Sequence, residues 1–164
     1  MKISGMLLAL GIAFFGTSAC ISKGQNQVES ANTTFAERLE EVLTLTENKY
    51  KSSNRNFGIN FSDGQMVIFQ MVKRTLLENS ETNEFGYGIH LSFDGSFPET
   101  KGELERFTNS DFAKKFHHHV WDGIPTYQLD LKVDRDHITE MTKKIIEVVY
   151  EKEVSKIEID EFEI

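Results

Sequence analysis

Histidines are the residues whose type and spacing come closest to a chemical site in this sequence. Three of the five stand side by side as His117-His118-His119. On a β-strand, His117 and His119 would share one face and could hold a single Zn or Cu ion. A third ligand would have to come from His90, Asp94 or a distant acid. This pattern makes a metal-binding protein one hypothesis for the chain.

The residues before the triplet favour a helix instead. Ser110 or Asp111 could cap it, and Phe112 and Phe116 are spaced four apart. Two side chains separated by two positions lie ~200° apart around a helix and cannot hold one ion. In that case the histidines form a surface or partly packed cluster at a helix end, where imidazoles suit the helix dipole.

A second group of polar residues lies in the alternating segment 85–94, where apolar residues occupy the odd positions. His90, Ser92 and Asp94 match a catalytic triad in composition. Alternate strand residues stand ~6.5–7 Å apart, so the outer two cannot join one hydrogen-bonded relay. Gly86 and Gly88 share that face and leave a shallow groove. The residues Gly86, Gly88, His90 and Ser92 therefore form either a ligand-binding face or the ordinary wet face of a strand.

Standard catalytic and nucleotide-binding motifs are missing from the sequence. It contains no GxxxxGK[ST], GxGxxG, HExxH or GxSxG pattern. Asp134-Arg135-Asp136 with Glu140 suggests calcium but lacks the glycine of an EF-hand loop, and it fits a strand end followed by a helix cap better. Whether the chain is an enzyme stays open, and binding without catalysis is the preferred interpretation.

The first twenty residues have the pattern of an export signal. Lys2 precedes an apolar run from Ile3 to Phe15, which is shorter than the ~20 residues that span a bilayer. Small residues follow, and the only cysteine of the chain, Cys20, ends the segment. A single cysteine excludes an internal disulfide framework and any CxxC site.

This segment resembles the signal of bacterial lipoproteins, with Thr17-Ser18-Ala19-Cys20 as the cleavage box. The resemblance implies that residues 1–19 are removed and that Cys20 is acylated, which anchors the chain in the lipid bilayer of the cell envelope. Ile21 follows in place of the aspartate that retains lipoproteins at the inner membrane, which indicates the outer membrane. The alternative is ordinary cleavage after Ala19, which would leave a periplasmic protein with a free thiol.

Charge limits the partners that the chain can take. The 164 residues carry 18 basic and 26 acidic side chains, a net charge of −8. Removal of the leader, whose only charged side chain is Lys2, would lower this to −9. Such a body is unsuited to nucleic acid, and electrostatic steering favours a basic protein partner.

The mature chain is predicted to be one domain behind a tether. Residues 20–33 comprise Cys20 and a small, polar, aperiodic spacer. Residues 34–164 then form a single domain, in which a helix begins with the capping box Thr34–Glu37 and runs to about residue 51. A second helix is expected from about Asp136 to 151, with Asp136 as its N-cap.

Alternation of apolar and polar residues predicts strands at 57–61, 85–94 and 126–134, and a last strand at 157–163 with a bulge or an acidic edge at Asp160-Glu161. Segment 66–77 fits a strand or a buried helix, and its composition favours the helix slightly. Pro98 and Pro125 are expected in loops. Strand 126–134, the second helix and the last strand suit a βαβ crossover. The predicted fold class is α+β, a small antiparallel or mixed sheet with helices packed on one face.

Overall fold

A computed structural model describes residues 33–50, 57–75 and 85–164, all within a compact unit that spans Asn32–Ile164. The predicted leader and most of the tether therefore lie outside the described residues. The elements follow one another as α1 (Phe35–Tyr50), β1 (Phe57–Asp63), β2 (Met66–Thr75), β3 (Phe85–Ser92), α2 (Pro98–Asn109), η2 (Ala113–Lys115), β4 (His117–Trp121), β5 (Ile124–Leu131), α3 (Arg135–Lys144), η3 (Ile145–Val149), η4 (Val154–Lys156) and β6 (Glu158–Glu163).

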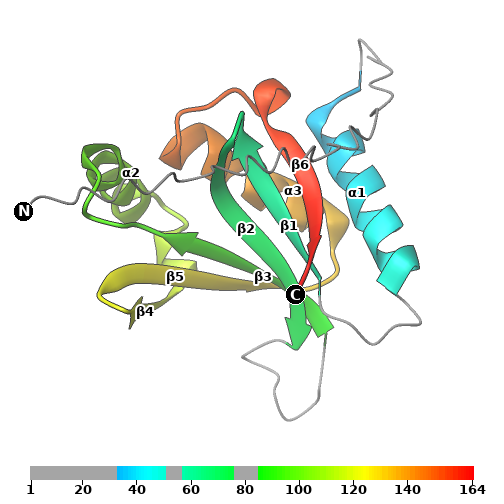
Figure 1. Cartoon of the computed structure of the whole chain (residues 1–164), viewed down its shortest axis with the longest axis horizontal. Coiled ribbons are helices and arrows are strands. Elements are labelled where there is room, and N and C mark those ends of the chain that lie inside the picture. The colour runs from blue at the N-terminus through cyan, green and yellow to red at the C-terminus, as the bar shows by residue number, and fades with distance from the viewer. Residues whose placement is uncertain (1–32, 51–56, 76–84) are drawn as a thin grey trace, which may run out of the picture. The chain divides into compact units, whose positions relative to one another are not determined.

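The strands form one six-stranded sheet in the order β4-β5-β3-β2-β1-β6, and every pair of neighbours is antiparallel. Helices α1 and α3 pack on one face of this sheet (Figure 1). The α+β prediction is confirmed. β5 and β6 are parallel, as the expected βαβ crossover requires. They are not neighbours in the sheet, because β3, β2 and β1 lie between them. β5 already has β3 and β4 on its two sides, and β6 pairs with β1 at the far edge.

The hydrophobic core lies between the sheet and these helices. Alternate residues of the inner strands point into it, and Ile59, Met71 and Ile89 are fully buried. Leu39 of α1 and Ile138 of α3 cover them from the helix side. The regular period of two along the strands therefore separates a dry face under the helices from a polar face opposite.

Local signals fix the start of both core helices. The side chain and backbone N–H of Thr34 donate to the Glu37 carboxylate, and the Glu37 N–H donates to the Thr34 hydroxyl at 3.3 Å, which confirms the capping box. The cap of α3 is Asp134, whose carboxylate accepts from the N–H groups of Asp136 and His137. The prediction of Asp136 as the cap is therefore wrong by two residues.

The preference for a helix over residues 66–77 is also wrong. Residues 66–75 form β2, the longest strand, which pairs with β1 on one side and with β3 on the other. Ile68, Phe69 and Met71 are buried there. Two neighbouring strands satisfy the backbone on both sides, and this long-range pairing outweighs the helix-forming composition of the segment.

Helix α2 is an element that the sequence interpretation missed. Pro98 occupies its first turn, where a missing N–H costs nothing, and the helix ends where the Ser110 N–H donates to the Phe107 carbonyl. The helix expected at 110–116 is instead the short 3₁₀ turn η2. Pro125 also lies outside a loop, within β5, where its carbonyl accepts from the Phe93 N–H at 3.0 Å.

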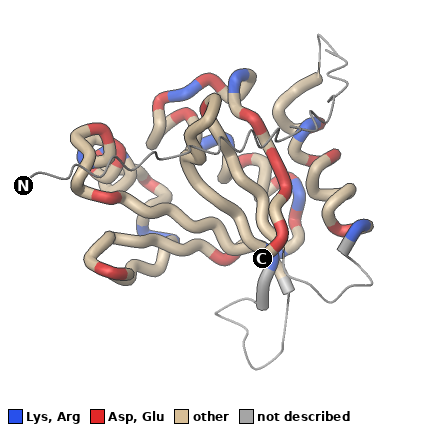
Figure 2. The backbone as a smooth tube through the Cα atoms, viewed as in Figure 1, with Lys and Arg blue, Asp and Glu red and all other residues tan. Residues whose placement is uncertain are grey.

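β6 is an acidic edge strand. Its register with β1 is regular from Glu158 to Glu163, so the bulge suggested at Asp160-Glu161 is absent, and an irregularity occurs instead between Phe61 and Ser62 of β1. Figure 2 shows acidic residues along β6, whereas the central strands are largely uncharged. A Cβ atom on Gly58 would lie 2.2 Å from the Phe162 ring, so only glycine lets β6 lay this ring on the sheet.

Candidate functional site

The predicted binding residues of β3 lie together on the sheet face opposite the helices. Tyr87, Ile89 and Leu91 point into the core with no exposed surface, so the intervening residues face the other way. There the backbone positions of Gly86 and Gly88 are buried, His90 is half-buried and Ser92 is exposed. The alternation expected from the sequence therefore places these four residues on one face.

Strand register extends this face into a line of polar side chains across all six strands. We call it the polar row, and its members in spatial order are His117, Gln128, His90, Gln70, Asn60 and Asp160. The Gln70 amide donates to Asn60 at 2.8 Å, and Gln128 contacts His90 Nδ1 at 3.4 Å. The sequence interpretation missed Gln70 because β2 was assigned to a helix, although a strand assignment would have placed it opposite His90.

The histidine triplet is in a strand, not at a helix end. In β4, His117 and His119 share the face of the polar row, whereas His118 points to the helix side and packs on the Tyr127 ring at 4.7 Å. His90 is two strands away from β4, roughly 10 Å by strand spacing. Within residues 33–50, 57–75 and 85–164, no three His, Cys, Asp or Glu side chains form a metal-binding group. Metal binding stays a prediction that zinc or copper content of the untagged chain would test.

Large apolar side chains are exposed at one end of the sheet. We call this surface the apolar end, and it consists of Met66, Val67, Phe97, Val120 and Trp121. Antiparallel pairing brings the start of β2, the end of β3 that leads into α2, and the tip of the β4–β5 hairpin to this same end. Trp121 is 73% exposed and Phe97 is 58% exposed. Met66, Val67 and Phe97 lie beside α2, whereas Val120 and Trp121 lie on the edge strand β4, so the apolar end has two parts.

A pocket of about 280 Å³ opens within the apolar end. Met66, Val67 and Phe97 supply apolar walls, and Glu103 of α2 and Tyr150 also line it. Burial raises the pKa of the Glu103 carboxyl above its ordinary value, while Arg106 and Lys152 act in the opposite direction. Burial likewise raises the pKa of the Tyr150 hydroxyl. The pocket therefore combines apolar walls with two groups that have lost part of their hydration.

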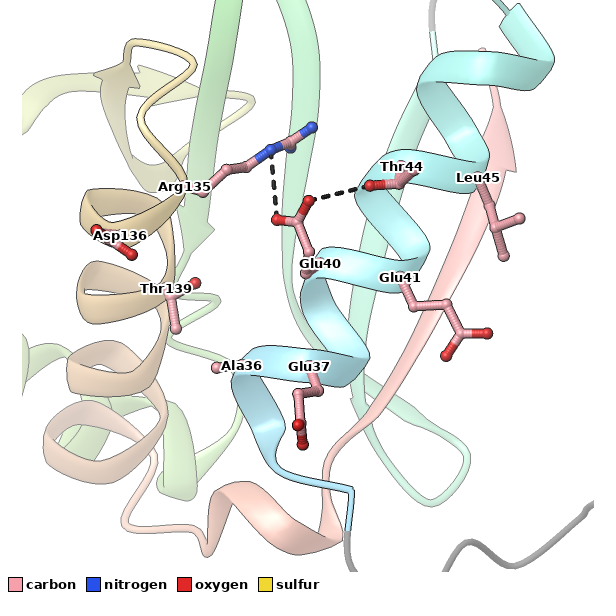
Figure 3. Close-up of a pocket in the computed structure, with 9 residues that line it drawn as sticks. All are labelled: Ala36, Glu37, Glu40, Glu41, Thr44, Leu45, Arg135, Asp136 and Thr139. Carbon is pink, nitrogen blue, oxygen red and sulfur yellow. Dashed lines mark hydrogen bonds and ion pairs between the residues drawn. The ribbon is translucent and has the colours of Figure 1, made fainter.

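A second cleft lies between α1 and α3, where Glu40 of α1 faces Arg135 of α3 (Figure 3). The Arg135 guanidinium is 3.5 Å from Glu40 and 2.8 Å from Glu47. The Tyr87 hydroxyl donates to Glu47, and burial together with this carboxylate raises the pKa of that hydroxyl. Arg135 pairs with two carboxylates at once, so the cluster joins α1, β3 and α3. One cation does not balance both carboxylates, so the cleft keeps a net negative charge.

Comparison with known proteins gives no family for the chain. No protein-family model matches it, and neither a curated protein nor a solved structure is significantly similar. Among the described helices, none has the length and hydrophobicity needed to cross a membrane.

Proposed function

We propose that this chain is a lipoprotein of the bacterial cell envelope, anchored through acylated Cys20, whose α+β domain binds a protein partner without catalysis. The leader pattern of residues 1–20 supports the anchoring, and Ile21 supports the outer membrane as the destination. Acyl chains contribute ~0.8 kcal/mol per buried CH₂, so two or more of them hold a protein durably in a bilayer. Anionic bilayer lipids do not attract an acidic domain, so the acyl chains on Cys20 would have to hold the chain at the membrane.

The observation that carries the binding half of the proposal is the apolar end. Trp121 and Val120 lie on a short edge strand, and Phe97 and Met66 lie beside a pocket. Aromatic side chains exposed in this way are enriched at the centres of protein interfaces, where they fill pockets of the partner. The net negative charge of the chain favours a basic partner, because complementary charge accelerates encounter.

Replacement of Trp121 by serine is expected to abolish partner capture. Full-length wild-type chain, used as bait in solubilised envelope extract, should retain a partner protein. The amount retained by Trp121→Ser should be lower by about tenfold or more, as for a central aromatic contact. Trp121 is mostly exposed, so the substitution should leave the free energy of unfolding within about 0.5 kcal/mol of wild type. Quantitative mass spectrometry of the retained proteins measures the difference.

Leu45→Ser is the matched control, because Leu45 is 59% exposed on α1 and does not belong to the apolar end. It should retain the partner as wild type does. Equal capture by Trp121→Ser and wild type, or no protein retained by wild type from several extracts, would contradict the proposal.

A further inference from the structure

Tyr150 places an unsatisfied polar atom at the pocket of the apolar end. Its side chain is 5% exposed, and its hydroxyl has no hydrogen-bond partner among the described residues. The ring stacks on Phe69, with centroids 6.0 Å apart, which restricts its movement. A buried hydroxyl without a partner is unfavourable, and natural proteins keep few of them. The hydroxyl atom itself is closed off from solvent, so the Tyr150 ring forms a wall of the pocket while its oxygen is not open to a ligand.

In the same pocket, Glu103 provides a carboxylate without a direct ion pair to any described residue. The carboxylate is half-buried and makes neither a hydrogen bond nor an ion pair with any residue that the structure describes. The two cations that act on this carboxylate each contact other groups directly. Arg106 donates to the Val149 carbonyl and pairs with Glu151 at 3.3 Å, and Lys152 pairs with Asp63 at 2.7 Å. Arg106 and Lys152 act on Glu103 from a distance only, so the carboxylate keeps room for a direct contact with a cation from a partner.

Glu99, the second acidic residue of the pocket, stabilises the start of its own helix. Glu99 lies in the first turn of α2, where a carboxylate stabilises the positive end of the helix dipole. Glu103 lies one turn further along, beyond this effect. The Phe97 ring stands exposed at the rim and offers a face to a cation, since aromatic rings attract ammonium groups within about 6 Å. The pocket thus suits a ligand with an apolar stem and a positive tip.

We propose that this pocket receives a lysine side chain of a basic protein partner, with its ammonium on Glu103 and its stem along Met66 and Phe97. The inference builds on the proposed function and names the chemistry of the partner. A compact ammonium group has three donors, so it can bond the Glu103 carboxylate and keep water on its other donors. The four methylenes of lysine pack well on apolar walls while the charged end finds its partners. The acidic body of the chain would steer such a partner towards the pocket.

Methyl NMR on the full-length chain in detergent micelles tests this proposal. Met66 lines the pocket, whereas Met71 and Met141 are buried in the core and serve as internal references. The probe is the capped peptide acetyl-Gly-Lys-Gly-amide, and its neutral counterpart carries Nε-acetyllysine. The lysine peptide should shift the Met66 methyl signal saturably and leave the two references in place. The acetylated peptide should bind at least about tenfold more weakly, because a charged hydrogen bond is lost.

Glu103→Gln should weaken lysine-peptide binding about tenfold, whereas Glu105→Gln should change it less than about twofold, since Glu105 is exposed on the same helix outside the pocket. Lowering the pH from neutral to about 4 should weaken binding to wild type, as Glu103 takes up a proton, and should leave Glu103→Gln almost unchanged. The other charged groups that influence Glu103 are Glu99, Arg106 and Lys152.

The proposal is overturned if no Met66 shift occurs, if the acetylated peptide binds equally well, or if Glu103→Gln binds as wild type does. A shift with n-butylammonium but not with the peptide would also overturn it, because the occupant would then be a free amine. These outcomes are independent of partner capture. If the Met66 shift is absent but partner capture still depends on Trp121, the lysine pocket is refuted and the proposed function stands. If the Met66 shift occurs but capture does not depend on Trp121, the proposed function is refuted.

Discussion

Phe107→Ala is expected to lower the free energy of unfolding by about 3–5 kcal/mol, the range for a large aromatic side chain removed from a core. Phe107 is fully buried and is the one buried residue of α2. Its ring centroid lies 4.7 Å from that of Tyr127 and 5.1 Å from that of Phe116. Its loss would leave a cavity among aromatic rings and would detach α2 from the end of the sheet.

Urea unfolding followed by circular dichroism measures this effect. Phe97→Ala is the matched control, because Phe97 adjoins the same helix but is 58% exposed. The control should lose less than about 0.5–1 kcal/mol, as exposed positions do. A loss below about 1 kcal/mol for Phe107→Ala would mean that the packing of α2 is not as described.

Arg135→Met is expected to destabilise the domain by about 1.5–3 kcal/mol. The substitution keeps an apolar stem of similar length and removes the cation that faces Glu47 and Glu40. Glu47 would then keep only the hydroxyl of buried Tyr87 beside its charge. The side chains of Arg135 and Glu47 are 28% and 31% exposed, so solvent screening holds the cost below that of a fully buried pair.

Lys144→Met is the control for Arg135→Met. Lys144 pairs with Glu140 at 2.7 Å on the surface of the same helix, and such a pair contributes about 0.3–0.5 kcal/mol. A double-mutant cycle of Arg135→Met with Glu47→Gln should give a coupling energy of about 1 kcal/mol or more. Equal losses for Arg135→Met and Lys144→Met would refute the assigned role of the cluster.

Elements with a strong local pattern could be predicted from the sequence. β3 and β5 alternate apolar and polar residues because one face is buried and the other is polar. The start of α1 is indicated by the capping box of Thr34 and Glu37. The pairs Glu140–Lys144 and Lys143–Glu147 also form as their spacing suggests. In each case the sequence signal lies within a few residues along the chain, although β3 and β5 themselves pair with distant strands.

Elements held by distant contacts could not be predicted in the same way. β2 is a strand because β1 and β3 pair with it, and its own composition does not show this. α2 is mostly polar and is held by Phe107. The rings that contact Phe107 include Phe93 and Tyr127, which lie outside α2 in the sequence. The polar row and the pocket depend in turn on these two elements. Of the polar row, the sequence alone therefore indicates as site residues His90 in β3 and His117 in β4.

The intact mass of the native protein, purified from membranes, tests whether this chain is a lipoprotein. We expect a chain that begins at Cys20 and carries the added mass of a diacylglyceryl group and its acyl chains. The variant Cys20→Ser/Ser22→Cys, which moves the thiol by two positions, should carry no lipid because the cysteine no longer follows Ala19. A native chain that starts at Cys20 without lipid, or one recovered from the cytosol with Met1 still attached, would contradict the account.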